Sequence, residues 1–121
     1  MPRLADLDTP AALIDTARLH ANIARMQQRM DALGVRFRPH VKTTKCLPIV
    51  QAQLAAGARG ITVSTLKEAE QFHTAGITDI LYAVCLVPAK LPQVLALRRR
   101  GCALQILTDS VAAAEAIAGH G

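Results

Sequence analysis

The sequence contains few aromatic residues and no tryptophan. Of its 121 residues only 2% are aromatic, and these are Phe37, Phe72 and Tyr82. Proteins hold single-stranded nucleic acid largely by stacking bases on aromatic side chains, and this chain offers no such platform. The net charge of +5 is moderate, and the basic residues are scattered along the chain rather than gathered in a stripe. We therefore expect no nucleic-acid partner.

Cysteines and long apolar runs are also scarce. Cys46, Cys85 and Cys102 are odd in number and lack Cys-x-x-Cys spacing, so we expect reduced thiols rather than a disulfide framework or a zinc knuckle. Residues 1–8 lack the apolar core of a signal peptide, and no run approaches the roughly 18 apolar residues of a membrane span. These absences predict a soluble, cytoplasmic protein with no membrane partner.

The apolar residues, 51% of the chain, recur in alternating strand and helix patterns. Strands are expected over residues 10–14, 35–41, 60–63, 79–84 and 103–108, and helices over 16–33, 47–56, 65–75, 88–100 and 110–118. Asp15 or Thr16 is expected to cap the first helix, a capping box of Thr65 and Glu68 to open the third, and Asp109 or Ser110 to cap the last. Glycines are expected to end the first four helices. Five strand–helix units with short connections require a parallel sheet, because crossover connections are right-handed. A repeat of about 20–25 residues is typical of a βα barrel or of an open α/β sheet.

The strand expected over 35–41 has an unusual pattern. Arg36, Arg38, His40 and Lys42 alternate with less polar residues, so they share one face of the strand. The lysine falls at the carboxyl end, where α/β folds place their chemistry. A lysine that is desolvated or lies beside other cations is partly deprotonated near neutral pH and can attack a carbonyl group. A half-exposed edge strand with solvated charges explains the same alternation.

The same residues carry a resemblance to a known family. The run Arg38-Pro39-His40-Val41-Lys42-Thr43, followed by Lys45, resembles the Arg-Pro-His-x-Lys-Thr-His-Lys signature of the D-threonine aldolase and D-serine dehydratase group. These are pyridoxal-phosphate enzymes of the alanine racemase (fold type III) class. Further matches lie at residues 8–11, 61–69 and 79–83. One position departs from the signature, because Thr44 stands where the family has its second histidine.

The resemblance implies an α/β fold, a (βα) parallel barrel (TIM barrel) of the alanine racemase N-terminal type, truncated to about half a barrel. Residues 1–121 would be the N-terminal part of this pyridoxal-phosphate-binding domain, with the C-terminal half-barrel and a β-domain absent. A half-barrel leaves two strand edges unpaired, so we expect either a fragment or a chain that pairs with a second one. The full-length form is expected to be a homodimer. The rival architecture is a doubly wound open sheet.

For activity, the resemblance implies a pyridoxal-phosphate-dependent lyase acting on a small D-3-hydroxy amino acid. A D-threonine aldolase type, which yields glycine and an aldehyde, is the first expectation. A D-serine or D-3-hydroxyaspartate dehydratase, or a non-catalytic cofactor-binding barrel protein, is the alternative. Lys42 is expected to be catalytic and to form the Schiff base with pyridoxal phosphate. His40, Thr43 and Tyr82 are expected to bind the cofactor, although a structural histidine and an ordinary core tyrosine explain His40 and Tyr82 equally well.

The family also uses a divalent metal near the substrate hydroxyl, where it acts as a Lewis acid. Its ligands belong to the C-terminal domain, and His20, His73 and His120 show no ligand spacing, so no metal site is expected in this chain. The loops that bind the cofactor phosphate are expected after later barrel strands. By itself the chain is therefore expected to bind the cofactor poorly and to be inactive.

Overall fold

The computed structural model describes residues 3–120. Three of its helices begin at capping residues that the sequence indicates. At the first helix the Asp15 carboxylate accepts a hydrogen bond from the Arg18 N–H (3.0 Å), and the expected capping box of Thr65 and Glu68 opens the third. The α-helices are α1 (Thr16–Ala32), α2 (Leu47–Ala55), α3 (Leu66–Thr74), α4 (Leu91–Arg99) and α5 (Val111–Ala118), and the 3-10 helices are η1 (Leu4–Asp6) and η2 (Pro88–Lys90).

Three expected elements differ from the structure, and two of them lie outside the sheet. The helix predicted over 88–100 is divided into η2 and α4, because Pro92 in the first turn of α4 has no N–H with which to continue a helix from Pro88. The strand predicted over 10–14 is irregular and exposed. A strand needs a neighbouring backbone to satisfy its polar groups, and no segment within residues 3–120 pairs with this one.

The strands form a parallel sheet in the order β1 (Ile61–Val63), β2 (Asp79–Cys85) and β3 (Ala103–Leu107). The predicted strand over 35–41 lies beside β1, where its backbone is extended. Thr62 N–H donates to the Pro39 carbonyl (2.8 Å), Val41 N–H donates to the Thr62 carbonyl (2.9 Å), and His40 bridges Thr62 in parallel. Pro39 has no N–H to donate, which explains why this segment makes an isolated bridge instead of a regular ladder.

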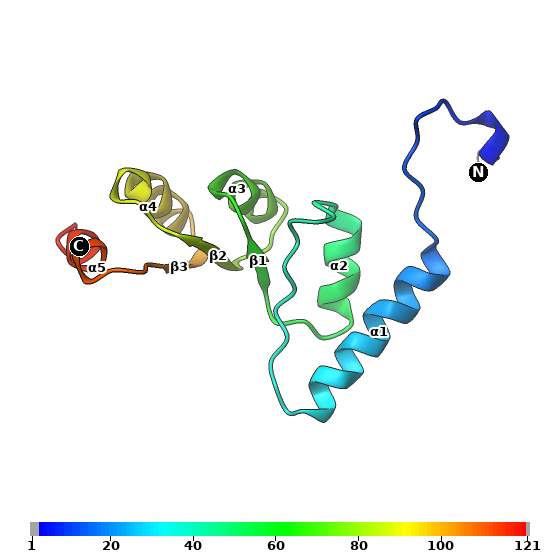
Figure 1. Ribbon diagram of the computed structural model, residues 1–121, viewed down its shortest axis with the longest axis horizontal. Helices are drawn as coiled ribbons and strands as arrows, with labels where there is room; N and C mark the ends of the chain where they lie inside the picture. The colour runs from blue at the N-terminus through cyan, green and yellow to red at the C-terminus, as the bar shows by residue number, and fades with distance from the viewer. Residues whose placement is uncertain (1–2, 121) are drawn as a thin grey trace.

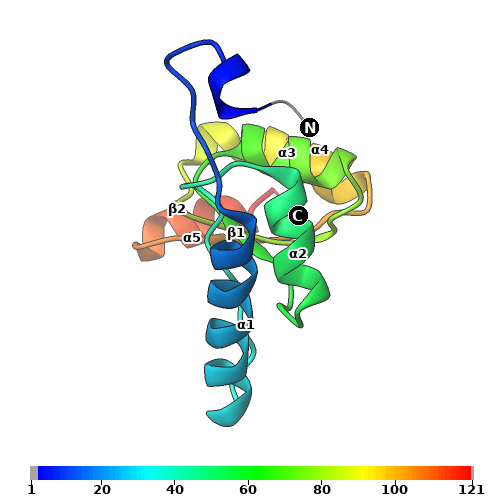
Figure 2. The ribbon, with the colours of Figure 1, turned by 90° about the vertical axis from the view of Figure 1, so that its right-hand side faces the viewer.

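Only one face of the sheet is covered by helices. The register aligns Ile61, Ile80 and Leu104, all at most 1% exposed, on the helix-facing side. Figure 1 shows α2, α3, α4 and α5 following one another along a curved layer beside the strands, and Figure 2 shows α1 projecting away from that layer. The opposite face of β3, which includes Gln105, is exposed. A doubly wound sheet would carry helices on both faces. The expectation of a partial, unclosed βα barrel is therefore confirmed.

Apolar side chains between the strands and the helices make up the core. Branched aliphatic residues dominate it, together with Phe72 and Tyr82, as the low aromatic content predicts. Helix α1 packs on α2 and lies outside this core. Between residues 3 and 120 no helix combines the length and the apolar character that crossing a membrane requires.

Gly60, at the turn that leads into β1, lies in a position that excludes any side chain. Its φ is +79°, and a Cβ there would lie 2.6 Å from Arg38 Nη1, from the Asp79 carboxyl carbon and from the Asp79 carbonyl oxygen. Gly101, before β3, has a similar φ of +91° but nothing within 4 Å of the corresponding Cβ position. A side chain at either position would therefore strain the backbone, but only at Gly60 would it also clash with neighbouring atoms.

We predict that Gly60→Ala lowers the free energy of unfolding by about 3 kcal/mol, because left-handed backbone strain and overpacking add together. Gly101→Ala should cost about 1 kcal/mol, from backbone strain alone. Urea denaturation followed by circular dichroism measures both. Equal losses in the two variants would contradict the assigned packing of Arg38 and Asp79 around Gly60.

Candidate active site

Lys42 lies in a turn at the carboxyl end of the extended 35–41 segment. We call residues 41–45 the Lys42 turn; it is closed by a hydrogen bond from the Lys45 N–H to the Val41 carbonyl (2.9 Å). Val41 is 1% exposed and belongs to the core, whereas Lys42 is exposed. The structure thus presents a free amine on a turn that is anchored in the core on its amino-terminal side.

His40 lies on the same face of the sheet as Thr62, to which it is bridged. Its Nδ1 accepts a hydrogen bond from the Lys42 N–H at 3.3 Å, which leaves the proton of a neutral ring on Nε2. Desolvation of the ring and the positive charge of Lys42 lower the pKa of His40 below its ordinary value, against a weaker opposite effect of the Glu68 carboxylate. At neutral pH His40 is therefore a neutral imidazole whose Nε2–H is able to donate to a ligand.

The structure brings together three of the four predicted site residues. Thr43 is exposed in the Lys42 turn, beside Lys42 and close to His40. Tyr82 is not with them. It is 1% exposed, it aligns with Val63 in the register, and it packs in the core on the helix-facing side of β2. Because alternate residues of a strand face opposite ways, Tyr82 points away from the face that carries His40, and its contact with a cofactor remains a prediction that this geometry does not favour.

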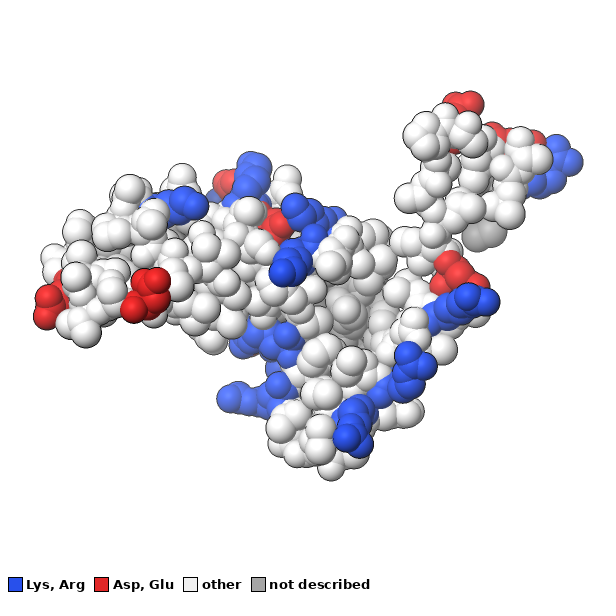
Figure 3. Space-filling model, in the orientation of Figure 1, with Lys and Arg blue, Asp and Glu red and all other residues white. Residues whose placement is uncertain are grey.

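Arginines gather at the other end of the same strands. Arg38 Nη1 lies 2.7 Å from the Asp79 carboxylate and 3.4 Å from the carbonyl oxygens of Ile61 and Asp79. Figure 3 shows basic side chains at the lower end of β1 in its view. A polar cavity of about 310 Å³ is lined there by Arg36, Arg38, Arg59, Asp79 and Gln105. Arg38 therefore has the structural, charge-paired position that its place in the strand predicts, well away from the Lys42 turn.

Glu68 is the site residue that sequence reasoning missed. Its capping box was predicted, but its side chain also reaches the Lys42 turn, where Oε1 lies 3.0 Å from Nζ of Lys45. Burial acts to raise the pKa of this carboxyl, but hydrogen bonds from the Ser64 and Thr65 N–H groups and the Lys45 ammonium outweigh burial and lower it. The capping motif was the available signal. The ion pair could not be foreseen, because Lys45 and Glu68 are separated in sequence by a helix and a strand.

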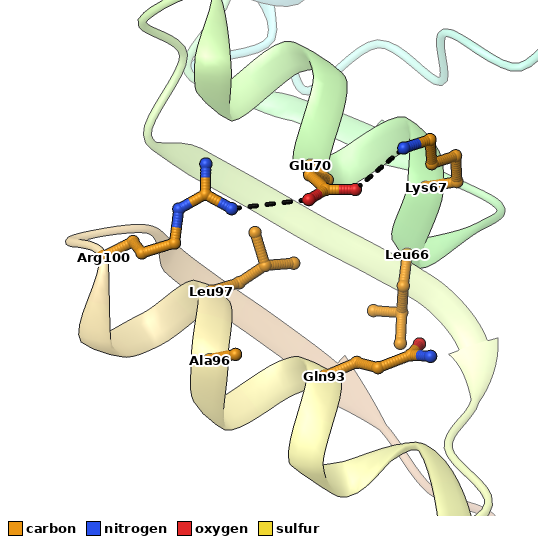
Figure 4. Close-up of a pocket in the computed structure, with 7 residues that line it drawn as sticks. All are labelled: Leu66, Lys67, Glu70, Gln93, Ala96, Leu97 and Arg100. Carbon is orange, nitrogen blue, oxygen red and sulfur yellow. Dashed lines mark hydrogen bonds and ion pairs between the residues drawn. The ribbon is translucent and has the colours of Figure 1, made fainter.

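The groove between α3 and α4 lies on the outer, helical side of the molecule. Figure 4 shows Glu70 between Lys67 and Arg100, with ion-pair distances of 3.0 and 3.5 Å. The groove holds about 360 Å³ and is floored by Leu66 and Leu97. Its charged groups are paired and exposed, so it offers no chemistry comparable to that of the Lys42 turn.

No metal centre is formed by the part of the chain that the structure describes. Within residues 3–120, no three His, Cys, Asp or Glu side chains come together in a way that would hold an ion. The cysteines are free: Cys46 is half-buried near the Lys42 turn, Cys85 is exposed, and Cys102 is buried with a pKa raised by desolvation.

Residues 14–121 match the family described as alanine racemase, N-terminal domain. A D-threo-3-hydroxyaspartate dehydratase of Delftia sp. (strain HT23) is 70% identical to the chain over 118 residues, covering 98% of this chain and 31% of that protein. A D-threonine aldolase of Arthrobacter sp. is 46% identical over 89 residues, covering 73% of this chain and 24% of that protein.

A solved structure of a D-threo-3-hydroxyaspartate dehydratase mutant in the metal-free form has the same fold. It superposes with a TM-score of 0.98 at 68% identity, and the match covers 100% of this chain and 32% of the other. The chain therefore spans about a third or less of the length of these relatives.

We predict that Glu68→Gln weakens the acid dependence of stability. The folded-state pKa of Glu68 lies below its ordinary value of 4.5, so its carboxylate stabilises the fold above about pH 4.5, and this contribution is lost as the pH falls through the folded pKa. Urea midpoints measured from pH 6 to pH 3 should fall less steeply in the variant than in the unmodified chain.

Glu70→Gln is the matched control, because the pKa of Glu70 is also lowered, by the exposed Lys67 and Arg100 side chains. Salt screens exposed pairs far more than buried ones. At about 0.5 M NaCl, the effect of Glu70→Gln on the acid dependence of stability should disappear, while the effect of Glu68→Gln persists. Loss of both effects in salt would show that Glu68 is not a buried, paired carboxylate.

Proposed function

Because the chain belongs to the alanine racemase N-terminal domain family, we propose that it is part of a pyridoxal-phosphate-dependent lyase acting on D-3-hydroxy amino acids, with Lys42 as the residue that bonds to the cofactor. The observation that carries the proposal is the exposed Lys42 amine, held on an anchored turn at the carboxyl edge of the sheet beside a neutral His40. The relatives, named as a dehydratase and an aldolase of D-amino acids, support it.

The residues at this edge fit pyridoxal phosphate chemically. Lys42 supplies a primary amine for the aldehyde, and His40 supplies an Nε2–H without bringing a second positive charge against the pyridine ring. Thr43 adds a hydroxyl in the same turn. When bound, the cofactor ring withdraws electrons from the bonds at the substrate α-carbon. We propose that the residues binding the phosphate lie in the two thirds of the relatives' length that this chain does not cover.

In the proposed reaction, the Lys42 amine has two successive roles. Its Nζ would hold the cofactor, and as the amine nearest the substrate it would also take the proton from the substrate α-carbon. His40 orients the turn through its hydrogen bond to the Lys42 N–H. His40 lies on the uncovered face of the sheet and the exposed Lys42 follows at its carboxyl edge, so this end of the uncovered face is the proposed substrate side.

Between the reaction types, we propose dehydration over aldol cleavage. Identity to the D-threo-3-hydroxyaspartate dehydratase is 70%, against 46% to the D-threonine aldolase. Loss of the α-proton and of the β-hydroxyl removes water across the Cα–Cβ bond, and a divalent metal at the hydroxyl would help it leave. The structure of one relative is of a metal-free form, which agrees with a metal in that protein, and we place its ligands outside this chain. The homodimer and the cytoplasmic location remain predictions.

We predict that Lys42→Ala abolishes covalent attachment of the cofactor. The test uses a hybrid enzyme, in which this chain replaces the corresponding segment of the 70%-identical Delftia dehydratase, together with the 121-residue chain itself. With pyridoxal phosphate, the hybrid should show a visible absorbance band that borohydride traps on Lys42, as identified by peptide mass spectrometry. Lys42→Ala should lose the band and at least about 100-fold in turnover.

Lys90→Ala removes an exposed lysine from η2, far along the chain, and should change neither the band nor turnover. A borohydride-stable label elsewhere than on Lys42 would overturn the proposal. A labelled hybrid beside an unlabelled 121-residue chain would show that residues outside this chain are needed for cofactor affinity.

We further predict that the hybrid and a full-length enzyme containing this chain release ammonia and a 2-oxo acid from D-threo-3-hydroxyaspartate. D-threonine should give little glycine or aldehyde, because the proposed chemistry breaks the Cβ–O bond and not the Cα–Cβ bond. Analysis of the products by mass spectrometry distinguishes dehydration from aldol cleavage. Glycine as the main product in the full-length enzyme would establish the aldolase alternative, and ammonia from D-serine would establish the D-serine dehydratase alternative.

A further inference from the structure

The Glu68 carboxylate joins two loops at the carboxyl edge of the sheet. Its side chain is 7% exposed, and Oε2 accepts hydrogen bonds from the N–H groups of Ser64 (2.8 Å) and Thr65 (3.3 Å), in the loop between β1 and α3. Its other oxygen, Oε1, is turned toward the Lys42 turn and lies 3.0 Å from Lys45 Nζ. One buried carboxylate therefore contacts both loops.

Lys45 is the partner that makes this buried charge tolerable. Within residues 3–120, Oε1 of Glu68 is buried without an aligned hydrogen bond, and its ionic partner is the Lys45 ammonium. A carboxylate taken out of water is destabilising unless it is paired. Lys45 itself remains largely exposed, so its stem lies over the loop and its charged end reaches down to the carboxylate.

The backbone of Lys45 is held in an unfavourable conformation. Its φ is +45°, which among the described residues no other non-glycine residue shares. Such a conformation persists where surrounding contacts enforce it. Here the contacts are the Lys45 N–H bond to the Val41 carbonyl and the ion pair to Glu68. Lys42 lies between these two anchors, Val41 in the core and Lys45 on Glu68.

The turn also has room to move when the second anchor is lost. A pocket of about 200 Å³ is lined by Lys45 and Glu68 themselves, together with Leu47 at the start of α2 and Phe72 of α3. Movement of the turn into this space would displace the Lys42 N–H from His40 Nδ1, because His40 lies outside the turn and is held in the sheet by its bridge to Thr62.

We propose that the ion pair between Lys45 and Glu68 is a clamp that positions the Lys42 turn, and that Lys45 is a positioning residue for the Lys42 amine. The inference rests on the proposed role of Lys42 in binding pyridoxal phosphate. Lys45 itself does not bond to the cofactor; it keeps the turn in the conformation from which Lys42 and His40 face the same ligand.

The test compares three variants by amide hydrogen exchange in the 121-residue chain and by kinetics in the hybrid enzyme. Lys45→Met removes the charge and keeps the length of the side chain. Glu68→Gln removes the charge of the partner and keeps an oxygen for the Ser64 and Thr65 N–H groups. Lys67→Met is the matched control, since Lys67 makes an ion pair of the same 3.0 Å length with Glu70 and lines the groove between α3 and α4 instead of contacting Glu68.

We predict that amides 42–45 exchange about tenfold faster or more in Lys45→Met and Glu68→Gln, and at the unmodified rate in Lys67→Met. In the hybrid, the first two variants should lower kcat about tenfold with KM little changed, because orientation of the amine is lost and substrate contacts are not. Borohydride trapping of Lys42 should slow in parallel. Lys45→Arg, which keeps the charge, should restore exchange and kcat toward the original values.

Unchanged exchange in Glu68→Gln would overturn the clamp, as would equal effects in Lys45→Met and Lys67→Met. Glu68→Gln and Lys45→Arg serve as the deciding pair when Lys45→Met does not fold. Failure of the proposed function is a different result: the exchange differences appear, but borohydride labels no cofactor on Lys42 of the unsubstituted hybrid.

Discussion

The pairing of the 35–41 segment with β1 is the constraint on which the candidate site depends. Two backbone hydrogen bonds, from Thr62 N–H to Pro39 and from Val41 N–H to Thr62, set the register of this segment against the sheet. A shift of one residue would turn every side chain of the segment to the opposite face. With the observed register, Val41 enters the core and His40 faces the uncovered side of the sheet, so the following Lys42 emerges at its carboxyl edge.

Charge is divided along the same strands. The amino ends hold Arg36, Arg38 and Arg59 around the single Asp79 carboxylate, whereas the carboxyl end holds the Lys42 turn and the buried Glu68. Arg38 is neutralised where it can also contact backbone carbonyl oxygens, which leaves it a structural residue. Glu68 stabilises its loop in the opposite way, as an anion supported by backbone N–H groups and one lysine. The uncovered face of the sheet lies between these two ends.

Most of the fold could be predicted because its signals are local. Capping at Asp15 and at Thr65, and the glycines that end the helices, depend on residues a few positions apart. The predictions failed where a distant partner decides the outcome. The apolar run over 10–14 makes no strand, because extended backbone needs a neighbour and none lies within the described residues. The position of Tyr82 also depends on distant partners, because the register of β2 turns it into the core; its contact with a cofactor remains a prediction.

The sequence by itself determined the order of helices and strands, the alternating basic face that contains His40 and Lys42, and the family signature around Lys42. These follow from side-chain periodicity and from residue types at short separation. Only the tertiary structure decided that helices cover one face of the sheet, that His40 is neutral through its surroundings, and that Glu68 joins Lys45 to the β1–α3 loop. Each of these depends on distances and burial between segments separated in sequence, and electrostatic energies change with both.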